Sequence, residues 1–135
     1  MIYSYAPIMK AKTGEFDALK SLRLSVLERI IPIFELPAQP PEKIELEKTI
    51  CNTAIKAGKA WQRVAMLDIS KWKPNAQTEN SVHILEYAFS QFRKNGVLVH
   101  PVIGYDRWDD PAYQQALKNI FTRYYKLKPC IRFDK

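Results

Sequence analysis

Five short segments of the chain alternate polar and apolar residues with a two-residue period, which is typical of β-strands. In each segment the charged residues gather at or near the C-terminal end. Stretches with apolar residues three or four positions apart, typical of amphipathic helices, separate each segment from the next. The predicted strands are residues 6–12, 30–36, 63–70, 97–107 and 128–135.

The intervening stretches predict four helices. The first begins at residue 13 and its apolar stripe continues to residue 30, and the second spans about residues 42–61. The third carries a stripe that starts at Val82 and ends before a left-handed glycine, and the fourth starts at a proline in the first helical position. The predicted end signals are Thr13, Asn80 or Ser81, Asn95 with Gly96, and Asp110 with Pro111.

Strand and helix alternate with short connections, which favours an α/β fold with a mainly parallel sheet. A doubly wound open sheet and an incomplete barrel both fit this alternation. One strand face carries charged residues, which suits a barrel interior that opens at one end. We therefore predict one α/β domain over residues 1–135, resembling the first half of a TIM-type barrel. Its first and last strand edges would be unpaired, which predicts self-association or completion by a protein partner.

Composition adds modest constraints. The 135 residues carry a net charge of +7, but no run of five basic residues. This charge makes a polyanionic partner such as nucleic acid or a nucleotide possible, while a solvated basic surface is the simpler explanation, because the basic residues are spread along the chain. Cys51 and Cys130 are isolated and predict buried thiols in a reducing compartment. No signal peptide or membrane-spanning stretch is predicted, so we expect a cytoplasmic protein.

The main candidate site is the cluster of charged residues at the C-terminal strand ends, where ligands bind in parallel α/β folds. Such a cluster could hold a metal, transfer protons or bind a phosphate group. Alternatively, Lys10 with Glu35 and Asp68 with Arg132 pair across the sheet and neutralise each other. The candidate ligand-binding residues are Lys10, Lys12, Glu35, Asp68, Asp106, Arg132 and Asp134.

Two more specific chemistries are possible for this cluster. Glu35, Asp68 and Asp106 would suit a magnesium ion, and Lys10 could form a Schiff base. No close acid spacing or other motif supports either, so we predict no metal site, and the sequence indicates no cofactor. His83, expected on an exposed or flanking helix face, and His100, near a strand start, are predicted to be structural.

Two loops pair basic with aromatic residues: Lys71, Trp72 and Lys73 in one, Arg107 and Trp108 in the other. Bases stack on aromatic rings and cations meet phosphates, so the loops could form a nucleic-acid or nucleotide platform. Alternatively, the tryptophans cover apolar loop residues or a protein interface.

Two segments resemble a known family. They are YAPIMKAKTGEFDAL (residues 5–19) and IIPIFELP (residues 30–37), and both are similar to the opening of the phage-type beta protein family. Leu67-Asp68-Ile69 and Pro101-Val102-Ile103 fit the same pattern. The resemblance implies a barrel-like fold, a bacterial or phage setting, and Lys10, Glu35 and Asp68 as recurring polar positions. It implies no activity, and family members are typically more than twice as long.

The sequence therefore predicts a short beta-family protein from a phage or phage-defence context. We expect a protein-binding module that self-associates or completes its open sheet with a partner. One alternative is an enzyme or a nucleotide- or phosphate-binding protein that uses the charged cluster. Another is nonspecific nucleic-acid binding through the basic surface.

Overall fold

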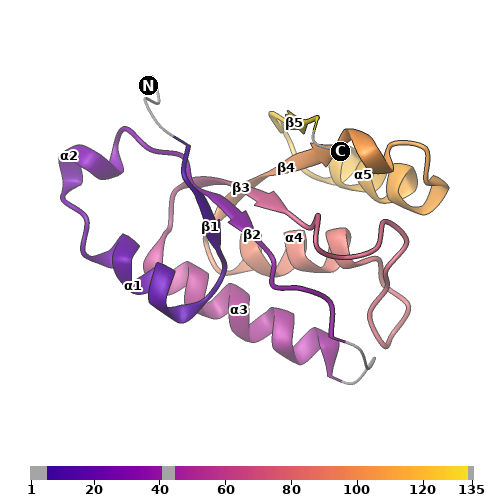
Figure 1. Cartoon of the computed structure of the whole chain (residues 1–135), viewed down its shortest axis with the longest axis horizontal. Helices are drawn as coiled ribbons and strands as arrows, with labels where there is room; N and C mark the ends of the chain where they lie inside the picture. Colours follow the sequence, from indigo (N-terminus) through magenta and orange to yellow (C-terminus); the bar gives the residue numbers. More distant parts are fainter. Residues whose placement is uncertain (1–5, 41–44, 134–135) are drawn as a thin grey trace.

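The computed structural model describes residues 6–40 and 45–133 and is an α/β fold with five parallel strands (Figure 1). The predicted position Asp134 lies outside the described residues. The strands are β1 (Ile8–Lys10), β2 (Ile33–Glu35), β3 (Val64–Asp68), β4 (Leu98–Gly104) and β5 (Cys130–Arg132). The helices are α1 (Thr13–Lys20), α2 (Leu24–Leu27), α3 (Leu46–Ala60), α4 (Ile84–Lys94) and α5 (Pro111–Arg123), and η1 (Tyr105–Arg107) is a 3₁₀ turn.

The strands follow one another in the sheet in chain order, β1-β2-β3-β4-β5, and every neighbouring pair is parallel. This confirms the predicted parallel α/β sheet. A doubly wound sheet reverses its strand order at a switch point, whereas consecutive order is the order of strands in a βα barrel. The barrel likeness as a whole stays a prediction.

The long helices form one layer, because α1 packs on α3, α3 on α4 and α4 on α5. Figure 1 shows α1, α3 and α4 on the same side of the strands. The helix-facing strand residues supply the core. Phe34 of β2, which is fully buried, lies between Phe16 of α1 and Phe92 of α4, at ring-centroid distances of 5.6 and 6.4 Å. The alternate strand residues point to the opposite face, which no long helix of the described chain covers.

Two predicted helix ends are confirmed. The Asp110 side chain accepts a hydrogen bond from the Tyr113 amide, and Pro111 occupies the first position of α5. Gly96 follows the end of α4 with φ of 87°, a left-handed conformation that favours glycine.

The predicted start of the third helix was wrong. Neither Asn80 nor Ser81 caps α4; His83 does, with its Nδ1 accepting from the Leu85 amide at 3.0 Å. The cause is Thr78, whose hydroxyl accepts hydrogen bonds from two amides in residues 80–82 and so holds this segment in a turn. Val82 therefore precedes the helix and is 37% exposed instead of lining its buried face.

The first predicted helix is interrupted. Helix α1 ends at Lys20, Ser21 donates its hydroxyl to the Asp17 carbonyl, and the short α2 follows after an extended Arg23. Serine competes for backbone bonds in this way and disfavours helix continuation. Thr13 is the first residue of α1, and its predicted capping role is wrong because the capping position is Lys12, which makes no side-chain cap. None of the helices in the described residues is both long and apolar enough to cross a membrane.

Candidate functional site

Three of the predicted site residues lie side by side at the C-terminal ends of neighbouring strands. The sheet register pairs Lys10 with Glu35 and Glu35 with Asp68. All three belong to the strand face opposite the helix layer, since the residues before them, Met9, Phe34 and Leu67, point to the helices. The sequence therefore predicted their common position correctly, while their role in binding stays a prediction.

Asp68 is engaged by Arg132. Arg132 Nη1 donates to Asp68 Oδ1 at 3.2 Å and Oδ2 at 3.1 Å, and its Nη2 donates to Asp106 Oδ1 at 3.2 Å. Asp68, 6% exposed, also accepts a 2.9 Å hydrogen bond from the Ser70 amide. The alternative in which Asp68 and Arg132 pair is thus confirmed, although their strands are not neighbours, because β4 lies between β3 and β5.

Glycine at position 104 lets Arg132 reach across β4. A Cβ atom there would lie 2.7 Å from Arg132 Nη2 and 2.7 Å from Asp106 Oδ1, closer than real contacts allow. The Gly104 amide donates to the buried Tyr113 hydroxyl at 3.2 Å. Burial raises the pKa of that phenol, and the bond from Gly104 opposes the shift. Gly104 therefore lets the Arg132 and Asp106 side chains lie close to the β4 backbone, and its own amide is held by the Tyr113 hydroxyl.

The predicted basic-aromatic platform is wrong at Trp72 and Arg107. Trp72 is 4% exposed and its indole donates to the Pro37 carbonyl at 2.7 Å. Arg107 is 8% exposed, and its Nη1 and Nη2 donate to the carbonyls of Trp72 and Ser70, both at 2.9 Å. These two side chains hold loops together and present no face to a nucleic acid. Trp108 remains half exposed, and Lys71 and Lys73 are exposed.

Lys71 instead joins the strand-end lysines. Lys10, Lys12, Lys71 and Glu35 line a hollow of about 260 Å³, and residues 36–38 complete its lining. The structure thus assigns Lys71 to the charged cluster, where sequence analysis placed it in a separate loop. The sequence could not reveal this position of Lys71, because it depends on the folded chain placing the loop after β3 beside the ends of β1 and β2.

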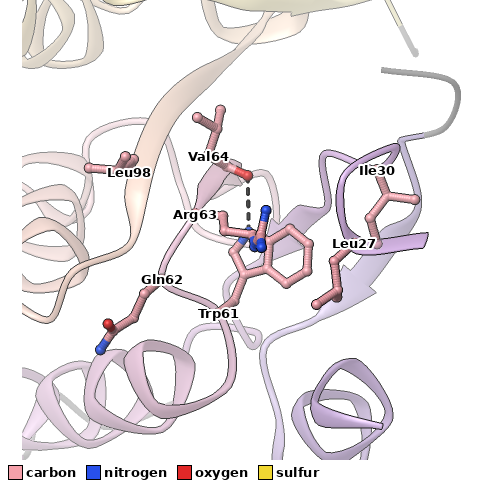
Figure 2. A pocket seen from close by; sticks show the side chains of 7 residues that line it. All are labelled: Leu27, Ile30, Trp61, Gln62, Arg63, Val64 and Leu98. Atoms are coloured by element: carbon pink, nitrogen blue, oxygen red, sulfur yellow. Dashed lines mark hydrogen bonds between the residues drawn. The ribbon is translucent and has the colours of Figure 1, made fainter. Parts of the chain in front are cut away.

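A second hollow, of about 270 Å³, lies at the opposite, N-terminal end of β3 and β4 (Figure 2). Trp61, whose indole donates to the Val64 carbonyl at 3.0 Å, stands between Leu27 and Ile30 on one side and Leu98 on the other. Its lining is mixed, and sequence analysis did not predict it. This end of parallel α/β folds serves stability more than ligand chemistry.

Sequence analysis also missed an apolar surface beside β5. Four exposed side chains, here called the β5 patch, surround a hollow of about 290 Å³ together with Ile103. The rings of Tyr105 and Phe133 contact each other at 5.6 Å. The β5 patch consists of Tyr105, Trp108, Ile131 and Phe133, which are 65, 49, 54 and 72% exposed.

Both histidines make structural contacts. His83 is 5% exposed, so its expected position on an exposed or flanking face was wrong, and its Nε2 bonds to the Pro74 carbonyl at 2.7 Å. His100 Nδ1 accepts from the Lys128 amide at 2.9 Å. Burial lowers the pKa of His100, and the charges of Arg93 and Lys128 lower it further. Over the described residues, no three side chains of His, Cys, Asp or Glu are grouped as a metal site would require.

The sequence model of the Beta protein family matches residues 5–135. The chain belongs to this family. The matched range includes residues 5–19 and 30–37, the two segments that resemble this family, and continues through β5. No curated protein and no solved structure matches the chain. Family membership therefore brings no activity with it, and the function has to be argued from the site.

Proposed function

We propose that this protein is a protein-binding module that extends its parallel sheet by pairing with a second copy of itself. The observation that carries the proposal is exposed apolar surface beside both edge strands, β1 and β5. In the described part of the chain, neither outer edge has a strand partner. Unpaired strand edges offer a row of backbone donors and acceptors to another chain.

The β5 edge supports this proposal through the β5 patch. Ile131 lies on the helix side of the sheet, in register with the buried Ile103, yet is 54% exposed. In a continued βα sheet the next helix would cover this position. An adjoining hollow of about 430 Å³, lined in part by Trp108, Leu117 and Phe121, continues the apolar surface over α5.

The β1 edge is apolar as well. Ile8 is 69% exposed, and Leu24 and Val26 of α2 are 59 and 40% exposed. A hollow of about 220 Å³ beside β1 is lined almost entirely by apolar atoms, including those of Met9 and Leu22. Since all strands run in one direction, β5 of one copy can pair with β1 of another and continue the sheet in the same order.

The energetics favour a closed pair of copies. Covering the four β5-patch side chains removes roughly 400 Å² of apolar surface from water, worth about 10 kcal/mol before costs. Association itself costs about 4–15 kcal/mol. One edge contact therefore gives weak binding at best. A two-fold dimer forms two β5–β1 contacts in one association step. The free energy gained from apolar burial therefore doubles, while rotational and translational freedom is lost only once.

The proposed setting is the cytoplasm, in a phage or phage-defence context. Two cysteines without disulfides, Cys51 and Cys130, support a reducing compartment. The phage setting rests on the family resemblance alone.

Light scattering coupled to size-exclusion chromatography over a range of concentrations tests the proposal. We expect a dimer that dissociates on dilution. Because each copy carries a charge of +7, added salt should screen repulsion and strengthen the dimer. Ile131→Lys should shift the midpoint of dissociation to at least about tenfold higher concentration, because a desolvated charge costs more than 1.4 kcal/mol.

Ile55→Lys is the matched control, since Ile55 is 37% exposed on α3, away from both edges. It should leave the dimer intact. A monomer at every concentration, or equal effects of the two variants, would overturn the proposal. A complex that forms with another protein only and weakens with salt would replace self-pairing with an acidic partner.

A further inference from the structure

The hollow at the ends of β1 and β2 carries an excess of positive charge. Lys10, Lys12 and Lys71 line it together with a single carboxylate, that of Glu35. The three lysines are exposed at the rim, and no ion pair of any of them with a described carboxylate is found. Three lysines beside one concave surface, whose remaining lining is largely apolar, attract anions, because a cleft with an excess of one charge concentrates the field.

The rest of the strand-end cluster does not cancel this charge. Asp68, which lies next to Glu35 in the register, is bound to Arg132 and to the Ser70 amide. Asp106 is bound to Arg132 as well. The acids of β3 and η1 are thus committed to ion pairs with Arg132 of β5. Around the hollow, three lysines therefore remain with one carboxylate, that of Glu35.

The size and lining of the hollow favour a small ligand. Its volume of about 260 Å³ is below the range of about 300–1,000 Å³ typical of drug-sized ligands. No aromatic side chain lines it, and the nearby Trp72 is buried. Binding of single-stranded nucleic acid relies on exposed aromatic rings for base stacking. A compact anion fits these features, and a nucleic-acid strand does not.

We propose that Lys10, Lys12 and Lys71 bind the phosphate group of a small phosphorylated molecule in this hollow. Lysine ammonium groups bind phosphate oxygens as point charges with charge-assisted hydrogen bonds. Glu35 lies on the same surface and repels the phosphate, so it limits the affinity and disfavours more highly charged anions. Lys10 is the last residue of β1, so the site adjoins one edge of the proposed dimer contact. Lys12 and Lys71 lie outside both edge strands, and phosphate binding does not depend on self-pairing.

Inorganic phosphate is the probe, measured by calorimetry and by phosphorus NMR against chloride at equal ionic strength. We expect binding in the millimolar range or tighter. Each of Lys10→Gln, Lys12→Gln and Lys71→Gln should weaken phosphate binding by about five- to tenfold, through loss of a charge-assisted hydrogen bond. Glu35→Gln should have the opposite effect and tighten it, because it removes the one negative charge.

Lys94→Gln is the matched control, since it makes the same charge change on an exposed lysine at the C-terminus of α4, near the start of β4. It should leave phosphate binding unchanged. Thermal unfolding without phosphate checks that each variant folds. The proposal is overturned if the wild type does not bind phosphate, if Lys94→Gln weakens binding as much as the rim variants, or if Glu35→Gln weakens it. Binding of a single-stranded oligonucleotide without binding of phosphate would assign the lysines to nucleic acid instead.

Discussion

The ion pairs of Arg132 allow a direct test of how burial sets the strength of a charge pair. Arg132 contacts Asp68 at 3.1 Å and Asp106 at 3.2 Å, so the distances are nearly equal. The burial differs, since the Asp68 side chain is 8% exposed and that of Asp106 is 40% exposed. Water screens the Asp106 pair, whereas the Asp68 pair is largely shielded. We expect the two coupling energies to differ severalfold.

The magnitudes follow from this contrast. Hydrogen bonds to buried charged groups contribute about 1.5–3 kcal/mol, so the coupling between Arg132 and Asp68 should be about 2 kcal/mol. For the pair with Asp106 it should be about 0.5 kcal/mol. Arg132→Met should lower the unfolding midpoint by about 7–10 °C, since about 1 kcal/mol corresponds to 3–4 °C at this chain length. It leaves the Asp68 carboxylate buried with the Ser70 amide as its remaining bond.

Double-mutant cycles with Arg132→Met, Asp68→Asn and Asp106→Asn, measured by urea denaturation, give both couplings. The exposed pair of Asp17 and Lys20, at 3.8 Å, is the control and should show a coupling near zero. A coupling to Asp106 equal to or larger than that to Asp68 would refute the reasoning, because Asp68 is both more buried and held by two hydrogen bonds from Arg132 instead of one.

Three further outcomes are expected. Gly104→Ala should destabilise the fold by about 0.5–1 kcal/mol, measured by urea denaturation, because its Cβ pushes apart the Arg132 Nη2 group and the Asp106 carboxylate, which are both ends of movable side chains. The pKa of His100 lies below its usual 6.5, so its contribution to stability is present above pH 6.5 and is lost as the pH falls toward the folded-state pKa; His100→Gln should remove this part of the acid sensitivity, seen in unfolding midpoints against pH. Trp72→Phe should cost about 0.5–1.5 kcal/mol in the same denaturation assay, because the hydrogen bond from the indole to the Pro37 carbonyl is lost.

The two-residue alternation in the strands predicted side-chain positions correctly, whereas residue types in the loops did not. Period-two alternation placed Lys10, Glu35 and Asp68 on one face because side chains in strands alternate strictly. Local spacing could not reveal that Arg107 turns inward. Its donors bond to carbonyls of the loop after β3, more than thirty residues earlier in the chain. From sequence alone, a basic residue next to a tryptophan predicts a binding surface. The contacts of Arg107 with the carbonyls of Ser70 and Trp72 are visible only in the folded structure.

Strand bounds failed for a related reason. The predicted second strand began at residue 30, whereas β2 covers only Ile33–Glu35. The predicted fourth strand continued to residue 107, whereas β4 ends at Gly104 and η1 follows. Composition indicates which residues favour extended structure, but where a strand ends depends on its pairing with the adjacent strand in the sheet. At Gly104, the turn that follows brings Asp106 back toward Arg132, a contact that only the assembled sheet defines.

The charged strand ends divide into two parts with different consequences. Arg132 belongs to β5, a three-residue strand at the sheet edge, and its bond to Asp68 ties that edge to the middle of the sheet. A short edge strand has few backbone bonds of its own, so this ion pair helps to hold β5 and the adjoining β5 patch in place. No ion pair of Lys10, Lys12 or Lys71 is found among the described residues. The proposed self-pairing and the proposed phosphate binding should therefore respond to different substitutions, those of Arg132 for the first and those of the lysines for the second.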